Sequence, residues 1–587
     1  MDIRILEKAN NYIEQETEKR FSDQIKALID EKNEKELSER FYKNLAFGTA
    51  GLRGIIGGGT NRMNPYVVKK AAQGMANYLI KALPKEAEAG ELKAVIAYDS
   101  RHYSPQFAES SALIFAANGI TCFLFSSLRP TPELSFAIRE LGCHTGVVVT
   151  ASHNPPEYNG YKAYWSDGAQ ITPPHDTGII DEVNKTEVVK SISRSDAIQS
   201  GKLKIIDSEI DEKYWSIVKA KINRHELIEK MSNDVEIVYT PLHGTGAMHV
   251  EKILGDMGFK ILTVPEQREP DGNFPTVSYP NPEDPKALKM GFELAEKTHA
   301  DILMATDPDA DRFACAVRNA DNEMQIISGN QMGALLTDYI CLTAKEFGKM
   351  PAAPAIVRSI VTSSLSDSIA KSYGVQTFEC LTGFKWICGL AEKMTVSGSN
   401  TYLYGFEESF GYNIGTEVRD KDGIATAAIC AEMALYWKSK NKSLFDRLNE
   451  LFVEHGLYIE KTINKVFKGA EGAKIMQAMM KLLRENTPAE IAEIPIKKIR
   501  DVLLGIEYSP SNKNATTKID LPESNVLQYY LEDGTVLSVR PSGTEPKIKT
   551  YIIHRRPCKE NSIEDEKQKG DEVIKSIEIA IEKILSE

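Results

Sequence analysis

The sequence lacks the features that would mark a membrane or a secreted protein. No apolar run approaches the about 18 residues that a membrane-spanning helix needs. The N-terminal stretch MDIRILEKANNYIEQETEKR is charged from its start and has no apolar signal-peptide core. These two absences disfavour insertion into a membrane and export, and we expect the protein to be cytoplasmic.

Cysteine is sparse and scattered. The 8 cysteines contain no CxxC pair and most stand in apolar surroundings. A disulfide-stapled scaffold or a zinc ribbon would need a paired pattern. We therefore expect reduced cysteines in the core, at the positions Cys122, Cys143, Cys315, Cys341, Cys380, Cys388, Cys430 and Cys558.

An excess of positive charge is also missing. The chain has 71 Lys and Arg against 83 Asp and Glu, and its formal net charge is −12. A nucleic acid or an anionic membrane surface is thus disfavoured as a partner. An anionic small molecule could still bind where basic residues gather, so the local positions of Arg and Lys are informative.

What is present is an ordinary globular composition with an α/β pattern. At 587 residues, with 42% hydrophobic and 26% charged residues, the chain is long enough for three to five domains. Apolar runs of strand length end directly in polar clusters, and helical segments such as PQFAESSALIFAANG separate them. This favours α/β domains with mixed, mainly parallel sheets, whose ligands bind beyond the carboxyl ends of the strands. The runs are AVIAYDSRH, TGVVVTASHN, VEIVYTPLHG, ADILMATDPDADR, APAIVRSIVTS and TYLYGFEESFG.

The two ends of the chain read differently from the middle. The first 45 residues or so have helical spacing, and the glycine-rich AFGTAGLRGIIGGGTNRMN after them predicts a loop or hairpin. Near the other end, NVLQYYLEDGTVLSVRPSG predicts a hairpin that turns at Asp533 and Gly534. An amphipathic helix is expected from Gly570 to Ile584, which together with the hairpin indicates an α+β terminal domain.

The segment ATDPDADRF follows an apolar strand and carries three alternate carboxylates. Asp307, Asp309 and Asp311 can converge on one hard cation. An EF-hand loop is excluded, because its glycine and glutamate positions hold Arg312 and Arg318. A phosphatase with Asp307 as nucleophile fits only crudely. Because Arg312 directly follows the carboxylates, a metal ion and a phosphate sharing one site is the interpretation that we favour.

Two later loops suit the two parts of a sugar phosphate. In GFEESFGYNIG, Glu407 and Ser409 stand at a strand end between glycines, and such side chains suit a polyhydroxylated ligand. An ordinary loop would give the same pattern. The segment SVRPSGTEPKIK combines a guanidinium, two hydroxyls and a glycine, a chemistry that can cradle a phosphate without being a P-loop. These groups belong to Arg540, Ser542, Thr544 and Gly543.

The stretch TASHNPPEYNGYK places Ser152 in a tight turn after a strand. Serine is a poor nucleophile unless a neighbour activates it, and no G-x-S-x-G elbow surrounds this one. Lys162 could reach back as a proton carrier or a phosphate clamp. His153 fits either a structural hydrogen bond or a base.

Five motifs in one order make a family resemblance. GTAGLRG, TASHNPPEYNGYK, DPDADR, GFEESFGY and RPSGTEP extend from about residue 47 to 550. In these motifs the chain resembles the α-D-phosphohexomutase superfamily, most of all its phosphoglucomutases. The resemblance implies three similar α/β domains and a C-terminal α+β domain around a central cleft. The expected bounds are 1–215, 216–321, 322–455 and 456–587.

The resemblance also implies a role for each motif. Ser152 would be the phosphoserine, and it would hold one Mg²⁺ together with the three aspartates. Glu407 and Ser409 would bind sugar hydroxyls, and Lys385 in LTGFKW would belong to the sugar-recognition loop. The non-reacting phosphate would lie on the loop of Arg540, Ser542, Gly543 and Thr544. Arg53, Lys162 and Arg312 would contact the transferring phosphoryl group, with Lys162 as a candidate general acid/base, and His153 is a further catalytic candidate.

The implied activity is the interconversion of glucose 1-phosphate and glucose 6-phosphate, with glucose 1,6-bisphosphate as intermediate and activator. Gly411 stands where some members that accept mannose phosphates have histidine, which lowers the expectation of a phosphomannomutase. GTAGLRG and GFEESFGY are also similar to a branch with phosphopentomutases. A bisphosphate synthase, a phosphatase and a non-catalytic binding protein remain as alternatives, and a monomer and a dimer are both open.

Overall fold

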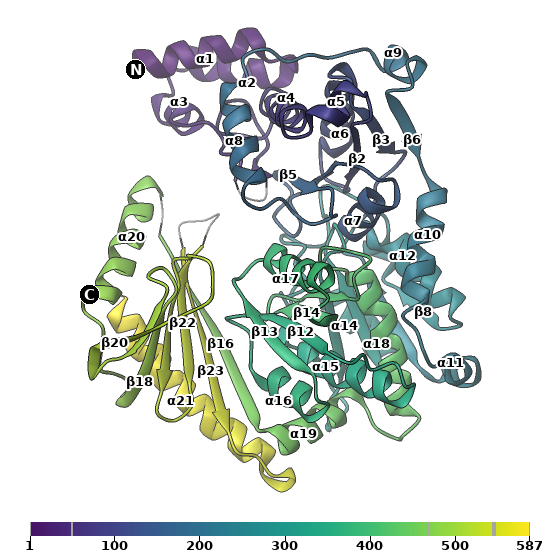
Figure 1. Cartoon of the computed structure of the whole chain (residues 1–587), viewed down its shortest axis with the longest axis vertical. Helices are drawn as coiled ribbons and strands as arrows, with labels where there is room; N and C mark the ends of the chain where they lie inside the picture. The colour runs from purple at the N-terminus through teal and green to yellow at the C-terminus, as the bar shows by residue number, and fades with distance from the viewer. Residues whose placement is uncertain (1, 49–50, 468, 543–546, 586–587) are drawn as a thin grey trace. The chain divides into compact units, whose positions relative to one another are not determined.

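The computed structural model describes residues 2–48, 51–467, 469–542 and 547–585. The chain divides into two compact units (Figure 1). The first comprises residues 1–329, 388–397 and 402–443, and the second comprises 330–387, 398–401 and 444–587. The six-stranded and five-stranded sheets lie within the first unit, the C-terminal sheet lies within the second, and each unit has a hydrophobic core of its own.

The first unit begins with three helices, α1 (Ile3–Gln15), α2 (Lys19–Asp30) and α3 (Glu34–Phe41). Asp2 and Asn33 cap α1 and α3 through their side chains, which accept backbone N–H groups. The helices are amphipathic and bury Tyr12, Ile25 and Phe41 in a small cluster of their own. The helical spacing of the first residues is thereby confirmed.

The first sheet has the order β1-β5-β4-β2-β3-β6. The pairs β2–β4, β2–β3 and β3–β6 are parallel, whereas β5 runs antiparallel to both β1 and β4. The buried run Thr145–Val149 is rich in valine, as suits an inner strand. The strands are β1 (Gly51–Ile55), β2 (Lys93–Tyr98), β3 (Thr121–Phe125), β4 (Thr145–Val149), β5 (Tyr158–Trp165) and β6 (Leu203–Ile206).

The glycine-rich segment expected as a loop or hairpin contains a strand. Gly51–Ile55 forms β1, which pairs along its whole length with β5. A Cβ at Gly51 would lie 1.8 Å from the carbonyl oxygen of Tyr161, so glycine here permits close approach of two backbones. The glycines that suggested a loop are thus explained by crowding at the edge of a sheet.

Helices around this sheet start with good capping signals. Asn64 accepts the N–H of Val67, and Pro65 begins α4 at a position where no N–H is needed. These helices enclose the core of the first domain together with the sheet. They are α4 (Pro65–Ala82), α5 (Pro84–Glu88), α6 (Ser104–Ala117), α7 (Thr131–Glu140), α8 (His175–Lys185) and α9 (Arg194–Gln199).

The second sheet has the order β11-β10-β9-β7-β8, in which β8, β7 and β9 are parallel and β10 and β11 continue antiparallel. Both sheets are mixed with a parallel centre, as predicted. The strands are β7 (Glu236–Thr240), β8 (Lys260–Thr263), β9 (Ile302–Thr306), β10 (Phe313–Arg318) and β11 (Met324–Ile327). The helices are α10 (Ser208–Lys219), α11 (His225–Met231), the 3₁₀ turn η1 (Ser232–Asp234), α12 (Gly246–Asp256), α13 (Pro265–Arg268) and α14 (Lys289–Thr298).

The two sheets share one local turn. Thr150 follows β4 and Thr240 ends β7, and each hydroxyl accepts the N–H of the second residue after it, at 2.8 and 3.1 Å. That second residue has a left-handed backbone in both, with φ of 52° at Ser152 and 47° at Leu242. The runs TGVVVTASHN and VEIVYTPLHG share the pattern Thr-x-x-His near their ends, and this shared pattern corresponds to a repeated turn.

The first unit also contains an antiparallel hairpin and a buried helix. Strand β14 (Thr401–Glu407), which joins this unit at Tyr402, pairs with β15 (Gly411–Ile414). Asp422 caps α18 (Gly423–Lys438) by accepting the N–H groups of Ile424 and Ala425. Nearly every residue of α18 is buried, which agrees with its apolar sequence.

The second unit starts with a parallel strand pair, β12 (Pro354–Ser359) and β13 (Gln376–Cys380). Its helices in this part are α15 (Gly329–Glu346), α16 (Leu365–Ser372), the start of α17 (Phe384–Ser397) and α19 (Leu444–His455). Gly329 and residues 388–397 of α17 belong to the first unit.

The C-terminal part of the second unit is an antiparallel sheet in the order β16-β23-β22-β21-β18-β19-β20, with β17 beside β18. Figure 1 shows α21 (Ile563–Ile584) running along this sheet, where Ile574, Ile577 and Ile581 are buried. The strands are β16 (Leu457–Val466), β17 (Glu490–Ile491), β18 (Ile494–Asp501), β19 (Ile506–Ser509), β20 (Asn512–Lys518), β21 (Leu527–Leu531), β22 (Val536–Pro541) and β23 (Lys547–Arg556), and the helices are α20 (Gly469–Glu485), the 3₁₀ turn η2 (Glu560–Ser562) and α21.

Two predictions for this domain can be compared with the structure. The hairpin at Asp533 and Gly534 is confirmed, because β21 pairs antiparallel with β22 and Gly534 has φ of 89°. The final helix begins earlier than Gly570, at Ile563. Gly570 therefore lies inside the helix. A glycine fits there because a Cβ would lie 1.8 Å from the side chain of Ile459. It marks close packing of the helix on β16 and not a helix start.

Two expected features of the whole chain remain. Within the described residues, no helix is long and apolar enough to cross a membrane. None of the cysteines, all of which lie in the described residues, forms a disulfide, and all except Cys558 are buried, so the expected core position is confirmed for the others. Cys558 is partly exposed because it follows the end of β23.

Candidate active site

The candidate nucleophile Ser152 lies in the turn that follows β4. Its backbone is left-handed, with φ of 52°, and its side chain is buried with only 3% of the residue exposed. The N–H of Ser152 donates to Thr150 Oγ1 at 2.8 Å. A non-glycine residue in this conformation is unusual and is tolerated where the surroundings hold it.

Arg101 supplies much of that support. It follows β2, is 1% exposed, and donates to the carbonyl oxygens of Ser152 at 2.5 Å, Pro155 at 2.8 Å and Tyr158 at 3.1 Å, and to that of Asn154. Its charge is balanced by Asp99, 3.4 Å away. Burial lowers the pKa of Arg101 to about 10, against the attraction of Asp99, so the residue stays cationic at neutral pH. The turn is therefore wound around one buried guanidinium.

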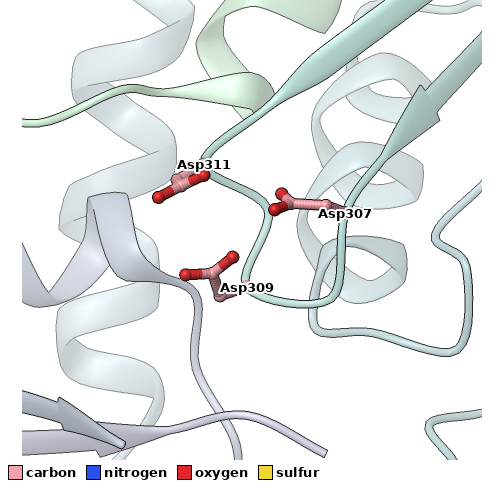
Figure 2. Close-up of side chains that lie close together, drawn as sticks. All are labelled: Asp307, Asp309 and Asp311. Carbon is pink, nitrogen blue, oxygen red and sulfur yellow. The ribbon is translucent and has the colours of Figure 1, made fainter. Parts of the chain in front are cut away.

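The three aspartates gather on the loop between β9 and β10 (Figure 2). They are fully buried, and each offers a carboxylate oxygen within 4.8 Å of the others. Ser152 Oγ donates to Asp307 Oδ2 at 2.6 Å. The predicted meeting of Ser152 with the aspartates is thus observed, and it joins loops from two different sheets.

Cations of the chain compensate these carboxylates. Lys162 Nζ lies 2.7 Å from Asp309 Oδ2 and 2.8 Å from Asp311 Oδ2. Lys421 Nζ lies 3.0 Å from Asp311 Oδ2. Burial opposes its charge, yet the carboxylates raise the pKa of Lys162 above its ordinary value. Lys162 is consequently a fixed cation at neutral pH.

The aspartates differ in their electrostatics. Burial, reinforced by the two other carboxylates, raises the pKa of Asp307 well above its ordinary value. Burial acts on Asp311 in the same direction, but Lys162 and Lys421 hold its pKa below the ordinary value. Ionising Asp307 therefore costs free energy unless a further cation lies nearby.

The donor set fits a hard divalent cation. Asp309 Oδ1 and Asp311 Oδ1 are buried and accept no hydrogen bond within the described residues. Buried carboxylate oxygens without partners are costly unless a cation or water meets them. Mg²⁺ prefers such oxygen ligands, so Asp307, Asp309 and Asp311 suit it.

The other residues predicted to meet the phosphoryl group lie at the same loops. His153 Nδ1 is 3.1 Å from Ser152 Oγ, and burial together with Arg312 and Arg53 lowers the pKa of His153, so its imidazole is neutral. Arg53 on β1 donates to Asn154 Oδ1 at 3.2 Å. The guanidinium of Arg312 pairs with Glu283, and its N–H donates to Asp307 Oδ1 at 3.0 Å.

The predicted sugar loop lies beside the metal-binding loop. Gly411 forms an isolated β-bridge with Arg312, and the N–H of Phe313 donates to the carbonyl of Phe410 at 3.0 Å. Glu407 is 9% exposed, and burial raises its pKa to about 7 although Lys421 opposes the shift. Ser409 is half-buried in the turn of the hairpin.

The remaining predicted residues belong to the second unit. Lys385 lies in the first turn of α17, with its Nζ 5.4 Å from the ring centre of Trp386. Arg540 is half-buried near the end of β22, and the N–H of Ser542 donates to the carbonyl of Lys547 at 2.7 Å. Gly543 and Thr544 lie outside the described residues.

Sequence profiles of known families match most of the chain. Those of the family described as phosphoglucomutase/phosphomannomutase match alpha/beta/alpha domain I at residues 44–190, domain II at 212–321, domain III at 328–455 and the C-terminal domain at 471–567. The chain belongs to this family.

Curated relatives cover nearly the whole length. A phosphoglucomutase of Staphylococcus saprophyticus is 34% identical over 532 residues, which are 90% of this chain and 94% of the relative. A phosphoglucomutase of Staphylococcus aureus (strain USA300) is 35% identical over 538 residues, with 91% and 94% covered. The family membership therefore extends over all parts of the site.

Solved structures agree with the fold. A putative phosphomannomutase from Thermus thermophilus has a TM-score of 0.67 at 21% identity, covering 93% of this chain and 100% of that one. Parafusin, a phosphoglucomutase from Paramecium, has a TM-score of 0.66 at 19% identity, with 88% and 90% covered. This likeness concerns the fold alone.

Reasoning from the sequence missed three contributors to the site of this family member. Arg101 stands in the polar cluster AYDSRH after a strand, and Lys421 in RDKDG follows the sugar loop, so both had a visible signal. Thr131 had none. Its hydroxyl donates to Asp309 Oδ2 at 2.8 Å and its N–H to the carbonyl of Asp309 at 2.9 Å, a contact that only the folded chain reveals.

Proposed function

We propose that the protein is a phosphoglucomutase, which interconverts glucose 1-phosphate and glucose 6-phosphate through phosphorylated Ser152. The observation that carries the proposal is the buried contact of 2.6 Å between Ser152 Oγ and Asp307, within a cluster of three carboxylates and two lysines. The relatives named phosphoglucomutase, which match about 90% of the chain, support this activity.

In the first half-reaction, the phosphorus–oxygen bond at Ser152 breaks and a new one forms to the free hydroxyl of glucose 1-phosphate, whose proton ends on Ser152 Oγ. The product is glucose 1,6-bisphosphate, the expected intermediate and activator. This bisphosphate reorients in the site, and its other phosphoryl group is transferred to Ser152, which leaves glucose 6-phosphate. Such transfers depend mainly on in-line positioning and on neutralising charge.

The chain's own residues would supply most of these needs. Lys162, Arg53 and Arg312 neutralise the phosphoryl oxygens, and Lys162 acts as a clamp because its pKa is raised and it keeps its proton. The neutral His153, 3.1 Å from Ser152 Oγ, is placed to accept the serine proton when the phosphoryl group returns. One Mg²⁺ held by Asp307, Asp309 and Asp311 would further neutralise the transferring group.

Substrate recognition would involve both ends of the sugar phosphate. Glu407 and Ser409 are assigned to the sugar hydroxyls, and Lys385 to the sugar-recognition loop. Arg540, Ser542, Gly543 and Thr544 are assigned to the phosphate that does not react. One fixed cradle must accept either end of the sugar, which explains why it is remote in sequence from Ser152.

The finer expectations belong to the same proposal. We place the protein in the cytoplasm, with a sugar phosphate as its partner and neither a nucleic acid nor a membrane, and as a monomer or a dimer. The domain bounds 1–215, 216–321, 322–455 and 456–587 remain predictions beside the matched family ranges.

A ³¹P NMR time course tests the proposed activity. The protein is mixed with glucose 1-phosphate, Mg²⁺ and a trace of glucose 1,6-bisphosphate, and the phosphorus species are followed. Growth of glucose 6-phosphate without inorganic phosphate is expected. Accumulation of inorganic phosphate would replace the mutase by a phosphatase, and faster turnover of ribose 1-phosphate in a parallel run would reassign the sugar.

A further inference from the structure

The loop that carries Lys385 packs against the C-terminal domain of the second unit. Seven buried apolar side chains form a cluster between them, which we call the loop cluster: Ile360, Val361, Leu381, Val502, Ile519, Val526 and Tyr551. The first three follow β12 and β13, and the other four come from the C-terminal sheet and its loops. Trp386 packs against this cluster.

Polar contacts join the same two parts. Glu379 near the end of β13 pairs with Arg500 on β18 at 3.0 Å, and within its own part it also pairs with Arg358 on β12 at 2.9 Å. Gln528 on β21 donates to the carbonyl of Ile360 at 2.8 Å. The loops after β12 and β13 are therefore held by both charge and apolar contact.

Lys385 stands at an unfavourable place for a lysine. It is the second residue of α17, where the helix dipole favours anions and disfavours cations. Lysine also has a flexible stem that must be ordered before its ammonium can meet a ligand. Its Nζ lies 5.4 Å from the ring centre of Trp386, within the range of a cation–π contact.

The turn before the helix brings the two side chains together. Gly383 has φ of 113°, and the N–H of Trp386 donates to its carbonyl at 2.9 Å. The indole thus has one contact with the loop cluster and another with the ammonium of Lys385.

From this arrangement we propose that Trp386 is a positioning residue for Lys385, and that the C-terminal domain holds Trp386 in place through the loop cluster. The inference rests on the proposed function, in which Lys385 contacts the sugar phosphate. It adds that the C-terminal domain acts on substrate recognition through Trp386, in addition to its own phosphate cradle.

A double-mutant cycle on the full chain tests the pair. Lys385→Ala, Trp386→Leu and the double variant are compared by the KM for glucose 1-phosphate, by kcat, and by the Kd for glucose 1-phosphate from calorimetry. Trp386→Leu should raise KM and Kd about fivefold and change kcat by less than about twofold, and it should add little in the Lys385→Ala background. Trp386→Phe keeps an aromatic face and should restore most of the affinity.

The support of Trp386 by the loop cluster is tested by a matched pair of variants. Ile519 belongs to the loop cluster, whereas Ile574 is equally buried in the other core of the same domain, with exposures of 7% and 5%. Ile519→Ala should raise KM about threefold, and Ile574→Ala should leave KM unchanged although it lowers the Tm at least as much.

The outcomes separate the inference from the function beneath it. If Lys385→Ala weakens binding and Trp386→Leu does not, or if the two effects add fully, the inference is wrong while the mutase stands. Equal effects of Ile519→Ala and Ile574→Ala on KM would refute the claim that the loop cluster holds Trp386 in place. Binding of glucose 1-phosphate without turnover would overturn the mutase alone, and an absence of binding would overturn Lys385's assigned role and the inference together.

Discussion

The region around Ser152 and the region around Arg540 differ in burial. Ser152 and the three aspartates are buried, and Lys162 and Lys421 pair with Asp309 and Asp311. Arg540, in contrast, is half-buried near the end of β22. In the proposed function, the transferring phosphoryl group therefore belongs to a buried, charge-paired region, whereas the other phosphate is assigned to a half-buried arginine.

The largest effect is expected at the nucleophile. Ser152→Ala removes the atom that carries the phosphoryl group, so kcat should fall by at least about a thousandfold. The rate of glucose 6-phosphate formation measures it. Ser111→Ala is the control, because Ser111 is also fully buried and donates to the carbonyl of Phe107 in its own helix. Substantial mutase activity in Ser152→Ala would refute the phosphoserine.

The second effect separates the two regions by stability. Lys162→Met leaves Asp309 and Asp311 without their shared cation, which should lower the free energy of unfolding by about 3–5 kcal/mol in the absence of Mg²⁺. Urea unfolding with and without Mg²⁺ measures it, and added Mg²⁺ should restore part of the loss. An unchanged stability would mean that the buried charges are compensated in another way.

The third effect belongs to the cradle. Arg540→Ala should raise KM for glucose 1-phosphate by about 10- to 100-fold through loss of a charged hydrogen bond, with the unfolding free energy within about 0.5 kcal/mol of wild type. Titrations of the activity with glucose 1-phosphate and with Mg²⁺ measure the KM and the Mg²⁺ requirement. The Mg²⁺ requirement should stay the same, and an unchanged KM would count against the assigned role.

The smallest effect is a pH dependence. Burial raises the pKa of Glu407 to about 7, and protonation turns one of its two acceptor oxygens into a donor, which should weaken its proposed contacts with the sugar hydroxyls. The kcat/KM should therefore fall a few-fold as the pH drops from 8 to 6, and Glu407→Gln should flatten that part of the profile. Because its folded-state pKa is raised, the same group should lower stability as the pH rises from about 4.5 to 7. A fall in kcat/KM that persists in Glu407→Gln would assign the titration elsewhere.

The sequence predicted the site wherever chemistry gathers at strand ends. Ser152 follows β4 and Asp307 follows β9, and their side chains meet at 2.6 Å. It could not predict Thr131, because a threonine at a helix start is usual and its contact with Asp309 depends on how two domains pack. Gly51 and Gly570 lie inside a strand and a helix, although glycine in a sequence usually indicates a break in regular structure. Each is glycine because another segment of the chain packs closely against it.

Arg101 has a further consequence for the turn that carries Ser152. This turn is held by backbone carbonyls that accept hydrogen bonds from a buried cation, and none of these contacts involves the side chain of Ser152. With the proposed role of Ser152 as phosphoserine, we therefore expect the turn to keep its shape when the serine is phosphorylated. The same backbone would then serve both states of the protein.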